Sequence, residues 1–169
     1  NNNEVLDYIT KSFELKRQGF FKPAIEMLYK ALSIENNNEE ILSQLAELYY
    51  LLENNERAIH YIEKTLEINP LHSDCLKLMK EIYYKDGNFV EAQKAAVKVF
   101  DLNPTAENFA DKIKILNKIN DFDSVKNLEH ADFEFDAEIY YQFAVSHYLN
   151  DDYQGAISYL EKAKELKPN

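Results

Sequence analysis

The chain has 169 residues, of which only three are glycine and four are proline, and its 19 basic and 30 acidic side chains give a formal net charge of −11. So few turn-forming residues exclude a β-sandwich, a β-barrel or a low-complexity tail, and they predict a largely helical protein. The hydrophobic content of 46% is enough for a substantial core. The single cysteine, Cys75, excludes an internal disulfide and leaves the redox compartment undetermined, with the cytoplasm as the expected location.

The distribution of charge argues against two kinds of partner. Charged or amide residues interrupt every apolar stretch well before the ~20 residues of a spanning helix, so we expect no membrane insertion. The net charges of residues 1–38, 39–72, 73–106, 107–136 and 137–169 are 0, −5, 0, −4 and −2. No segment is basic, so we expect no nucleic-acid partner. The acidic excess indicates a solvated outer face, with attraction of a basic partner as the alternative.

A period of 34 residues organises the chain. Two identical Asn-Pro pairs are separated by this distance, and an alanine stands twelve residues before each of their prolines. The same alanine recurs one period earlier, and the same alanine and proline recur near the C-terminus. The prolines are Pro70, Pro104 and Pro168, and the alanines are Ala24, Ala58, Ala92 and Ala156.

Each of the first three units contains two apolar stripes of helical period, separated by a short polar break. The units are residues 5–38, 39–72 and 73–105, and their breaks lie at residues 18–21, 53–55 and 85–88. Pro23 stands where a helix tolerates proline, in the first turn of the second helix. Gly87 follows an aspartate in a turn signal that suits a tight connection. The pattern predicts three consecutive helical hairpins.

The fourth unit, residues 106–136, is shorter than the others. Its best match to the marker alanine, Val125, lies only 31 residues before the marker of the next unit. We therefore expect a degenerate hairpin with a short second helix. Phe133 and Phe135 are expected to fill the space left by the missing last turn. The fifth unit, residues 137–169, returns to the hairpin pattern.

These features resemble the tetratricopeptide repeat family, whose unit is a helix–turn–helix of 34 residues. The family's small and aromatic positions in the first helix are matched by Ala46, Ala144, Tyr49 and Tyr83. The chain departs from the family in having no tryptophan, in Lys80 at an expected small position, and in Asn36 at the first closing proline. The resemblance covers nearly the whole chain and implies a single domain over residues 1–169. The implied fold is an all-α, right-handed superhelical solenoid of about five antiparallel helix pairs.

The resemblance also implies a binding site on the concave surface, which the first helix of each unit lines. The candidate peptide-binding residues on these helices are Ile9, Phe13, Arg17, Ser43, Glu47, Tyr50, Lys77, Glu81, Tyr84, Lys114, Asn117, Tyr141, Val145 and Tyr148. Tyrosines among both signs of charge suit an extended peptide or a partner helix, although the same tyrosines could instead complete packing between repeats. Some family members hold a partner's C-terminal carboxylate with a Lys, Asn and Arg clamp, which is not recognisable here. The corresponding positions are Ile9, Phe13, Gln44, Lys77 and Leu78.

No catalytic or metal-binding motif is recognisable. The four histidines lack ligand spacing, and there is no glycine-rich phosphate loop and no G-x-S-x-G. The closest group of ligand-type residues runs from His72 to Cys75 and falls at a helix start. There Ser73 is expected to cap the helix, Asp74 to complement its dipole, and Cys75 to be a small buried hydrophobe. We therefore expect no cofactor, no metal and no enzyme activity.

The leading hypothesis is a non-catalytic scaffold that binds a peptide or a partner protein in the concave groove. A second hypothesis is a structural module that self-associates through the ends of the helical stack. It is based on the lack of a polar capping helix after the last unit, which leaves Ile157, Leu160 and Leu166 partly uncovered. A third is that the chain, which begins at Asn1 and not at Met, is the repeat region of a larger multidomain protein.

Overall fold

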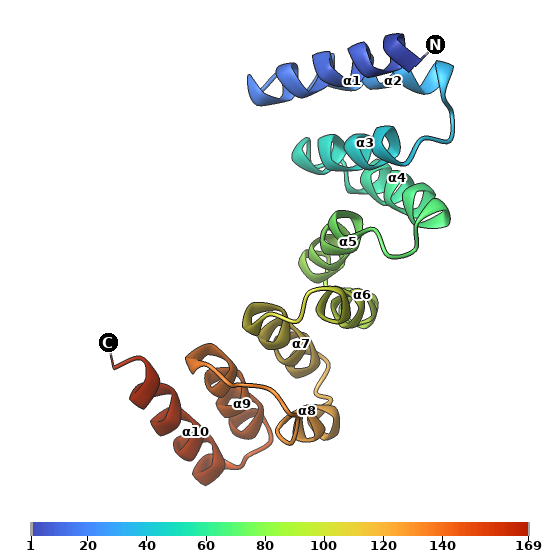
Figure 1. Cartoon of the computed structure of the whole chain (residues 1–169). Helices are drawn as coiled ribbons and strands as arrows, with labels where there is room; N and C mark the ends of the chain where they lie inside the picture. Colours follow the sequence, from blue (N-terminus) through green and yellow to red (C-terminus); the bar gives the residue numbers. More distant parts are fainter. Residues whose placement is uncertain (1, 169) are drawn as a thin grey trace. The chain divides into compact units, whose positions relative to one another are not determined.

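The computed structural model describes residues 2–168, which form ten helices and no strand (Figure 1). The helices are α1 (Asn2–Arg17), α2 (Phe21–Ile34), α3 (Glu39–Leu51), α4 (Asn55–Ile68), α5 (Ser73–Lys85), α6 (Phe89–Leu102), α7 (Ala106–Lys118), α8 (Phe122–Leu128), α9 (Ala137–Leu149) and α10 (Tyr153–Leu166). The predicted all-α class is confirmed. The outermost residues of the predicted domain, Asn1 and Asn169, lie outside the described residues. The chain divides into two compact units, Asn1–Met79 and Lys80–Asn169, which are described separately.

In the first compact unit, α1 packs along α2 and α3 along α4, while α2 also contacts α3. The core of this unit is aliphatic, with Leu28 of α2, Leu45 of α3 and Ile62 of α4 fully buried. The marker alanines Ala24 and Ala58 are also fully buried. A side chain this small lets helix axes approach to about 8–10 Å, which explains the recurrence of alanine at this position.

A cluster of tyrosines joins α2, α3 and α4. The rings of Tyr49 and Tyr61 are stacked with centroids 5.7 Å apart, and the hydroxyls of Tyr29 and Tyr49 are 2.6 Å apart. Arg57 donates a hydrogen bond of 3.3 Å to the Tyr49 hydroxyl. Burial raises the pKa of Tyr29 and of Tyr49. These tyrosines pack between repeats and hold their hydroxyls neutral inside the unit.

In the second compact unit, α7 contacts α6, α8 and α9, and α9 packs along α10. Its main core cluster contains Phe109 and Ile113 of α7, Val125 of α8, and Ile139 and Phe143 of α9. All five are nearly or fully buried. Because the cluster draws on three successive helices, no hairpin buries its apolar face alone.

The second helix of the fourth repeat is short, as the sequence predicts. α8 has 7 residues, whereas α2, α4, α6 and α10 each have 14. Phe133 lies flat on Phe109 with ring centroids 4.8 Å apart, and Phe135 meets Phe143 edge-on at 5.1 Å. The expectation that these two phenylalanines fill the missing turn is confirmed.

Every helical hairpin turns through one residue with positive φ. The five residues are Gly19 (85°), Glu53 (58°), Gly87 (78°), Asn120 (56°) and Asp151 (60°). They occupy the same place in each connection, two residues after the last residue of the first helix. Only two of them are glycine, so three turns hold a side chain in the left-handed region that usually favours glycine.

The start of α5 differs from its prediction in one detail. Ser73 is the first residue of the helix and does not cap it. The ring of His72 takes that role, because its Nδ1 accepts a hydrogen bond of 3.2 Å from the backbone N–H of Cys75. Cys75 is fully buried, as expected, and burial raises the pKa of its thiol to about 11.

His147 links the ends of three helices in the second compact unit. Its Nδ1 is 2.7 Å from Oδ2 of Asp152, which caps α10, and its Nε2 is 2.5 Å from Oε1 of Glu129, which follows α8. Burial lowers the pKa of His147, but the hydrogen bonds to Asp152 and Glu129 outweigh it, so the net pKa is raised. Burial and Glu129 also raise the pKa of the adjacent Tyr159 to about 12.

Candidate functional site

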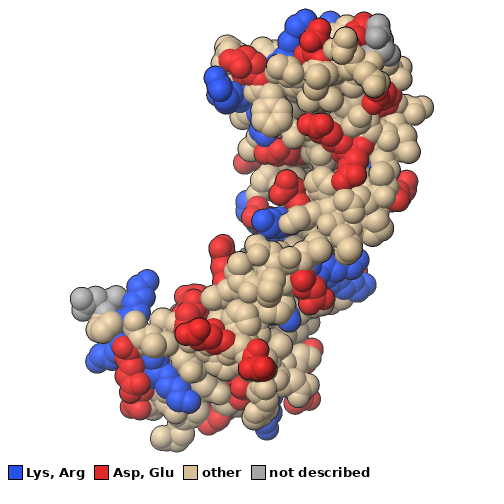
Figure 2. Space-filling view, in the orientation of Figure 1, with Lys and Arg blue, Asp and Glu red and all other residues tan. Residues whose placement is uncertain are grey.

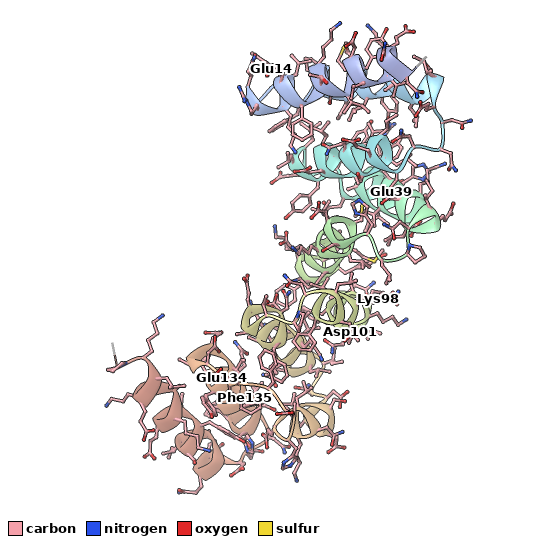
Figure 3. All side chains as sticks on the ribbon, viewed as in Figure 1. Glu14, Glu39, Lys98, Asp101, Glu134 and Phe135 are labelled. Carbon is pink, nitrogen blue, oxygen red and sulfur yellow. The ribbon has the colours of Figure 1, made fainter. Side chains whose placement is uncertain are left out.

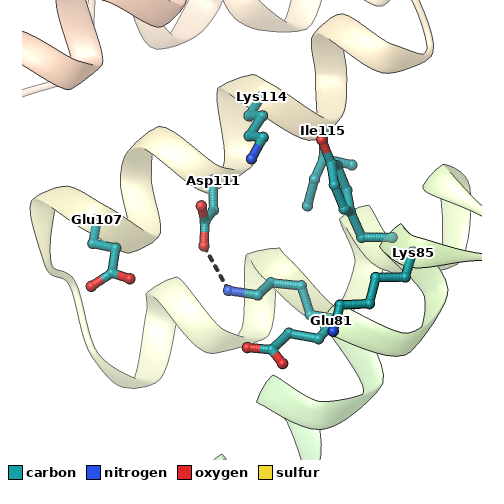
Figure 4. Close-up of a pocket in the computed structure, with 8 residues that line it drawn as sticks. Glu81, Lys85, Glu107, Asp111, Lys114 and Ile115 are labelled. Carbon is teal, nitrogen blue, oxygen red and sulfur yellow. Dashed lines mark hydrogen bonds and ion pairs between the residues drawn. The ribbon is translucent and has the colours of Figure 1, made fainter. Parts of the chain in front are cut away.

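The second compact unit contains a hollow between α5 and α7 (Figure 4). Its volume is about 210 Å³, and its lining residues are Lys80, Glu81, Tyr84, Lys85, Glu107, Asp111, Lys114 and Ile115. On each helix these positions are spaced by three or four residues or are adjacent, so they share one face. The hollow is therefore lined by first helices of successive hairpins.

Two contacts between α5 and α7 hold the walls of this hollow. Lys80 Nζ is 2.6 Å from Asp111 Oδ2, and the lysine side chain is only 13% exposed. Lys114 Nζ lies 5.1 Å from the centre of the Tyr84 ring, a cation–π contact. The same ring also meets Phe89 edge-on, with the ring centroids 5.4 Å apart. Tyr84 is thus fixed from two directions, and the hollow is pre-formed.

A second hollow lies between α7 and α9. It is lined by Glu107, Ala110, Asp111, Lys114, Asp136, Glu138 and Gln142. The two hollows share Glu107, Asp111 and Lys114, so they form one continuous surface, which we call the first-helix groove. It carries five carboxylates and three lysines, so its net charge is negative.

Several polar groups of the groove already have partners. Asp136 accepts a hydrogen bond of 2.9 Å from the Ile139 N–H and so caps α9. Gln142 donates one of 3.0 Å to Glu138. These contacts orient the carboxylates at the start of α9.

The first compact unit has its own hollow, lined by residues 37–40, Ser43, Gln44, Ile68, His72 and Asp74. Asn69 donates a hydrogen bond of 2.8 Å to Glu39, and the His72 ring lies 3.7 Å from the same carboxylate. This surface is also acidic, with Glu39, Glu40 and Asp74 on its wall.

The structure places the predicted peptide-binding residues in different environments. Glu81, Tyr84 and Lys114 line the first-helix groove, and Ser43 lines the hollow of the first compact unit. The other side chains that are open to solvent, fully or in part, are Phe13, Arg17, Glu47, Tyr50, Lys77, Tyr141, Val145 and Tyr148. Glu47 forms a salt bridge of 2.7 Å with Lys16. The Tyr148 ring packs on Tyr153, within its own hairpin.

Ile9 and Asn117 correct the predicted set, because neither side chain is accessible. Ile9 is only 7% exposed and belongs to the core of its unit. Asn117 is 5% exposed and donates a hydrogen bond of 3.1 Å to the backbone carbonyl of Gln142 on α9. An amide on a helix surface looks solvent-facing in the sequence, but here the next first helix covers it.

Sequence reasoning missed most of the charged groove wall. The missed residues are Lys80, Lys85, Glu107, Ala110, Asp111, Ile115, Asp136, Glu138 and Gln142. One signal could have found two of them. Lys16 pairs with Glu47 and Lys80 with Asp111, and each pair is separated by 31 residues, three fewer than the period. Opposite charges at this spacing mark first helices that face each other.

The described part of the chain shows neither a metal centre nor a transmembrane helix. Among residues 2–168, no group of three or more His, Cys, Asp or Glu side chains is placed to hold a metal ion. No helix in the same range combines the length and the apolar character needed to cross a bilayer.

Two family models match the sequence. Residues 17–99 match the model described as anaphase-promoting complex, cyclosome, subunit 3, and residues 137–169 match the tetratricopeptide repeat model. The second match coincides with the last hairpin of the 34-residue pattern. The chain belongs to the tetratricopeptide repeat family. A search of curated proteins found no match.

Solved structures with the same fold include proteins called MamA and YrrB. A MamA crystal structure matches 99% of this chain and 94% of its own, with a TM-score of 0.82 and 16% identity. MamA from Desulfovibrio magneticus RS-1 matches 98% and 96%, with a TM-score of 0.77 and 18% identity. YrrB, described as a TPR protein with an unusual peptide-binding site, matches 100% and 89%, with a TM-score of 0.81 and 17% identity. At these identities the likeness shows the tetratricopeptide repeat fold.

Lys80 is a departure from the family pattern that contributes to the wall of the groove. In the third tetratricopeptide repeat, Lys80 stands where the family has a small residue. Its side chain is largely buried, and its amine reaches Asp111 on the next first helix. The departure from the family pattern therefore builds part of the groove wall.

Proposed function

We propose that this tetratricopeptide repeat protein is a non-catalytic interaction scaffold that binds a peptide or partner segment along the first-helix groove. The observation that carries the proposal is the groove itself. Three successive first helices, α5, α7 and α9, contribute to two hollows that share Glu107, Asp111 and Lys114. A continuous surface of this kind suits an extended segment better than a small molecule.

The chemistry of the groove supports a protein partner. Tyr84 offers aromatic contact area and a hydroxyl, and its fixed position lowers the entropic cost of binding. The carboxylates favour a partner with basic residues and disfavour nucleic acid. A peptide-binding site is also named in the description of YrrB, which shares the fold. Three of the twelve accessible residues of the predicted set line the groove, and we propose the other nine as further contacts. We also propose the repeat units as predicted, over residues 5–38, 39–72, 73–105, 106–136 and 137–169.

The test begins with a randomised 12-residue peptide library screened against the full chain. Selected peptides are then measured by fluorescence anisotropy against Lys114→Glu and Glu107→Lys in the groove. The matched controls are Lys98→Glu and Asp101→Lys, which reverse exposed charges on α6, away from the groove (Figure 3). We expect the groove variants to change affinity by about tenfold or more and the controls to change it less than twofold. Equal affinities for all four variants would contradict the proposal.

A second candidate function is self-association through α10. This helix exposes Ile157, Leu160 and Leu166, of which Ile157 and Leu160 are three residues apart and share one face, and exposed apolar side chains of this kind are a recognised association surface. Light scattering over a concentration series separates the two functions. A mass that doubles with concentration and returns to that of the monomer in Leu160→Ser would support association, whereas a constant monomer mass would exclude it.

A further inference from the structure

A third hollow of the second compact unit lies beside the segment that joins α8 to α9. Its volume is about 770 Å³, and it is lined by Ala106, Phe133, Glu134, Phe135, Asp136, Ala137, Glu138, Leu166 and Lys167. We call it the phenylalanine pocket. It shares Asp136 and Glu138 with the first-helix groove, so the two surfaces adjoin.

The pocket combines apolar and acidic groups because apolar and acidic residues alternate in the segment that lines it. In residues 132–138 the phenylalanines and Ala137 are partly buried, while the acidic side chains between them are exposed. The segment bends at residues 131–133 and enters α9 at Ala137, and along it apolar side chains turned toward the core alternate with acidic side chains turned to solvent. The segment therefore contributes both apolar and acidic side chains to the pocket, and Glu134 and Phe135 are labelled in Figure 3.

The floor of the pocket is rigid. Phe133 is stacked on Phe109, and Phe135 packs against Phe143 and Tyr140 in the core. Leu166 of α10 contributes to the lining and is 58% exposed. An apolar side chain could bury surface here without any rearrangement of the floor, which favours binding.

The rim determines the charge of the occupant. Glu134, Asp136 and Glu138 surround the floor, and Lys167 is the single basic residue of the lining. Figure 2 shows acidic side chains gathered where α9 begins. An acidic surface raises the local concentration of cationic segments and opposes anionic ones.

We propose that the phenylalanine pocket is an anchor site for one large aliphatic side chain of a partner peptide whose neighbouring residues are lysine or arginine. The floor takes the aliphatic group, and the three rim carboxylates take the flanking cations. The proposal rests on the proposed scaffold function, but it uses a pocket that the groove variants Lys114→Glu and Glu107→Lys leave intact. Failure at one surface can therefore be told from failure at the other.

The direct test uses three fluorescein-labelled nine-residue peptides and the full chain. The first has a central leucine flanked by two lysines on each side, with glycine and serine spacers. The second replaces leucine with serine, and the third replaces the lysines with glutamate. We expect the leucine peptide to bind about tenfold more tightly than the serine peptide and the glutamate peptide not to bind. Raising sodium chloride from about 50 to about 300 mM should weaken the leucine peptide several-fold. Equal affinities of the leucine and serine peptides would overturn the proposal.

Two pairs of variants locate the anchor. Leu166→Ser removes an apolar wall, and Leu6→Ser makes the same change on α1, outside the pocket and at a side chain that is 60% exposed. Glu134→Lys reverses a charge on the rim of the pocket. Its control, Glu165→Lys, reverses an exposed charge on α10 that does not line the pocket. We expect Leu166→Ser to abolish the preference for leucine and Glu134→Lys to weaken the leucine peptide about tenfold, with both controls within twofold of the parent chain.

Three further outcomes are decisive. If Leu166→Ser behaves as Leu6→Ser does, the pocket is not the anchor. If light scattering shows a dimer that Leu166→Ser dissociates, a second copy of the chain covers the pocket and the proposal is wrong. The third outcome combines two results. If Lys114→Glu leaves the ratio of leucine-peptide to serine-peptide affinity unchanged, the anchor stands. If the peptides selected from the library also bind the groove variants with unchanged affinity, the groove assignment fails.

Discussion

Lys80 Nζ and Asp111 Oδ2 are 2.6 Å apart across the first-helix groove, and they join two helices whose residues are one repeat apart in the sequence. The pair is better shielded than a typical surface salt bridge, with side chains 13% and 32% exposed. A partner bound in the groove would meet this pair as a fixed feature of the wall. The contribution of this salt bridge to the free energy of unfolding can be measured directly.

We predict a coupling free energy of roughly 0.5–2 kcal/mol between Lys80 and Asp111. The measurement is a double-mutant cycle of Lys80→Ala and Asp111→Ala by urea unfolding. Lys80→Met keeps most of the aliphatic stem and should be less destabilising than Lys80→Ala, because the stem is buried. The cycle of Lys16 and Glu47 serves as comparison, since that pair has the same spacing and more exposed side chains. Strictly additive effects at Lys80 and Asp111 would show that the pair contributes nothing.

The positive φ angles of two hairpin turns predict opposite changes in stability when a glycine is introduced at one turn and removed from the other. Glu53 has a φ of 58°, which strains a residue with a Cβ, so Glu53→Gly should stabilise the protein by roughly 0.5–1 kcal/mol. Gly87 has a φ of 78° in the equivalent turn, so Gly87→Ala should destabilise it by about 1 kcal/mol. Thermal or urea unfolding gives both values. A destabilised Glu53→Gly would mean that the glutamate side chain has a role beyond the turn.

Gly155 breaks the rule that alanine is better than glycine inside a helix. It lies in the first turn of α10, and a Cβ at this position would collide with the carboxylate of Asp152 and come within 2.6 Å of His147 Nδ1. We predict that Gly155→Ala destabilises the protein by roughly 1–2 kcal/mol, although helix propensity alone favours the change. Gln154→Ala, at the exposed neighbouring position, should have an effect within about 0.5 kcal/mol. A Gly155→Ala variant as stable as Gln154→Ala would contradict this account.

The stability that His147 contributes should depend on pH. Its pKa is raised in the folded protein by Asp152 and Glu129, so the folded state binds the proton more tightly than the unfolded state. The contribution is therefore fully present below the unfolded pKa of about 6.5 and is lost as pH rises through the folded pKa. We predict that His147→Gln destabilises the protein by roughly 1–2 kcal/mol at pH 5.5 and by clearly less at pH 9. The measurement is urea unfolding of both proteins at each pH. A difference that is constant or that grows with pH would contradict the assignment.

The sequence predicted the hairpins well because their cause is local. Apolar residues recur with the helical period, and a buried alanine such as Ala58 must recur wherever two helices touch. The short fourth repeat was predicted for the same reason, since only 31 residues separate its marker, Val125, from the next marker, Ala156. Phe133 and Phe135 could be assigned because they are the apolar residues of the segment that replaces the missing turn.

Parts of the candidate site could not be predicted because they depend on which helix faces which. Asn117 is polar, yet it is buried by α9 and hydrogen-bonded to its backbone. Asp111 follows no family pattern, and only the orientation of α7 toward α5 brings it to Lys80. The turn at Glu53 was recognised as a break, but its left-handed backbone carries no glycine signal.

The seven-residue α8 gives the stack a reference point. A row of identical repeats would offer a bound segment several equivalent alignments, each displaced from the next by one repeat. α8 and the segment after it occur once among the described hairpins, so they make one position unlike its neighbours. A ligand that engages this irregularity can bind in a single alignment. The short α8 would then set the register of the bound segment relative to the repeats.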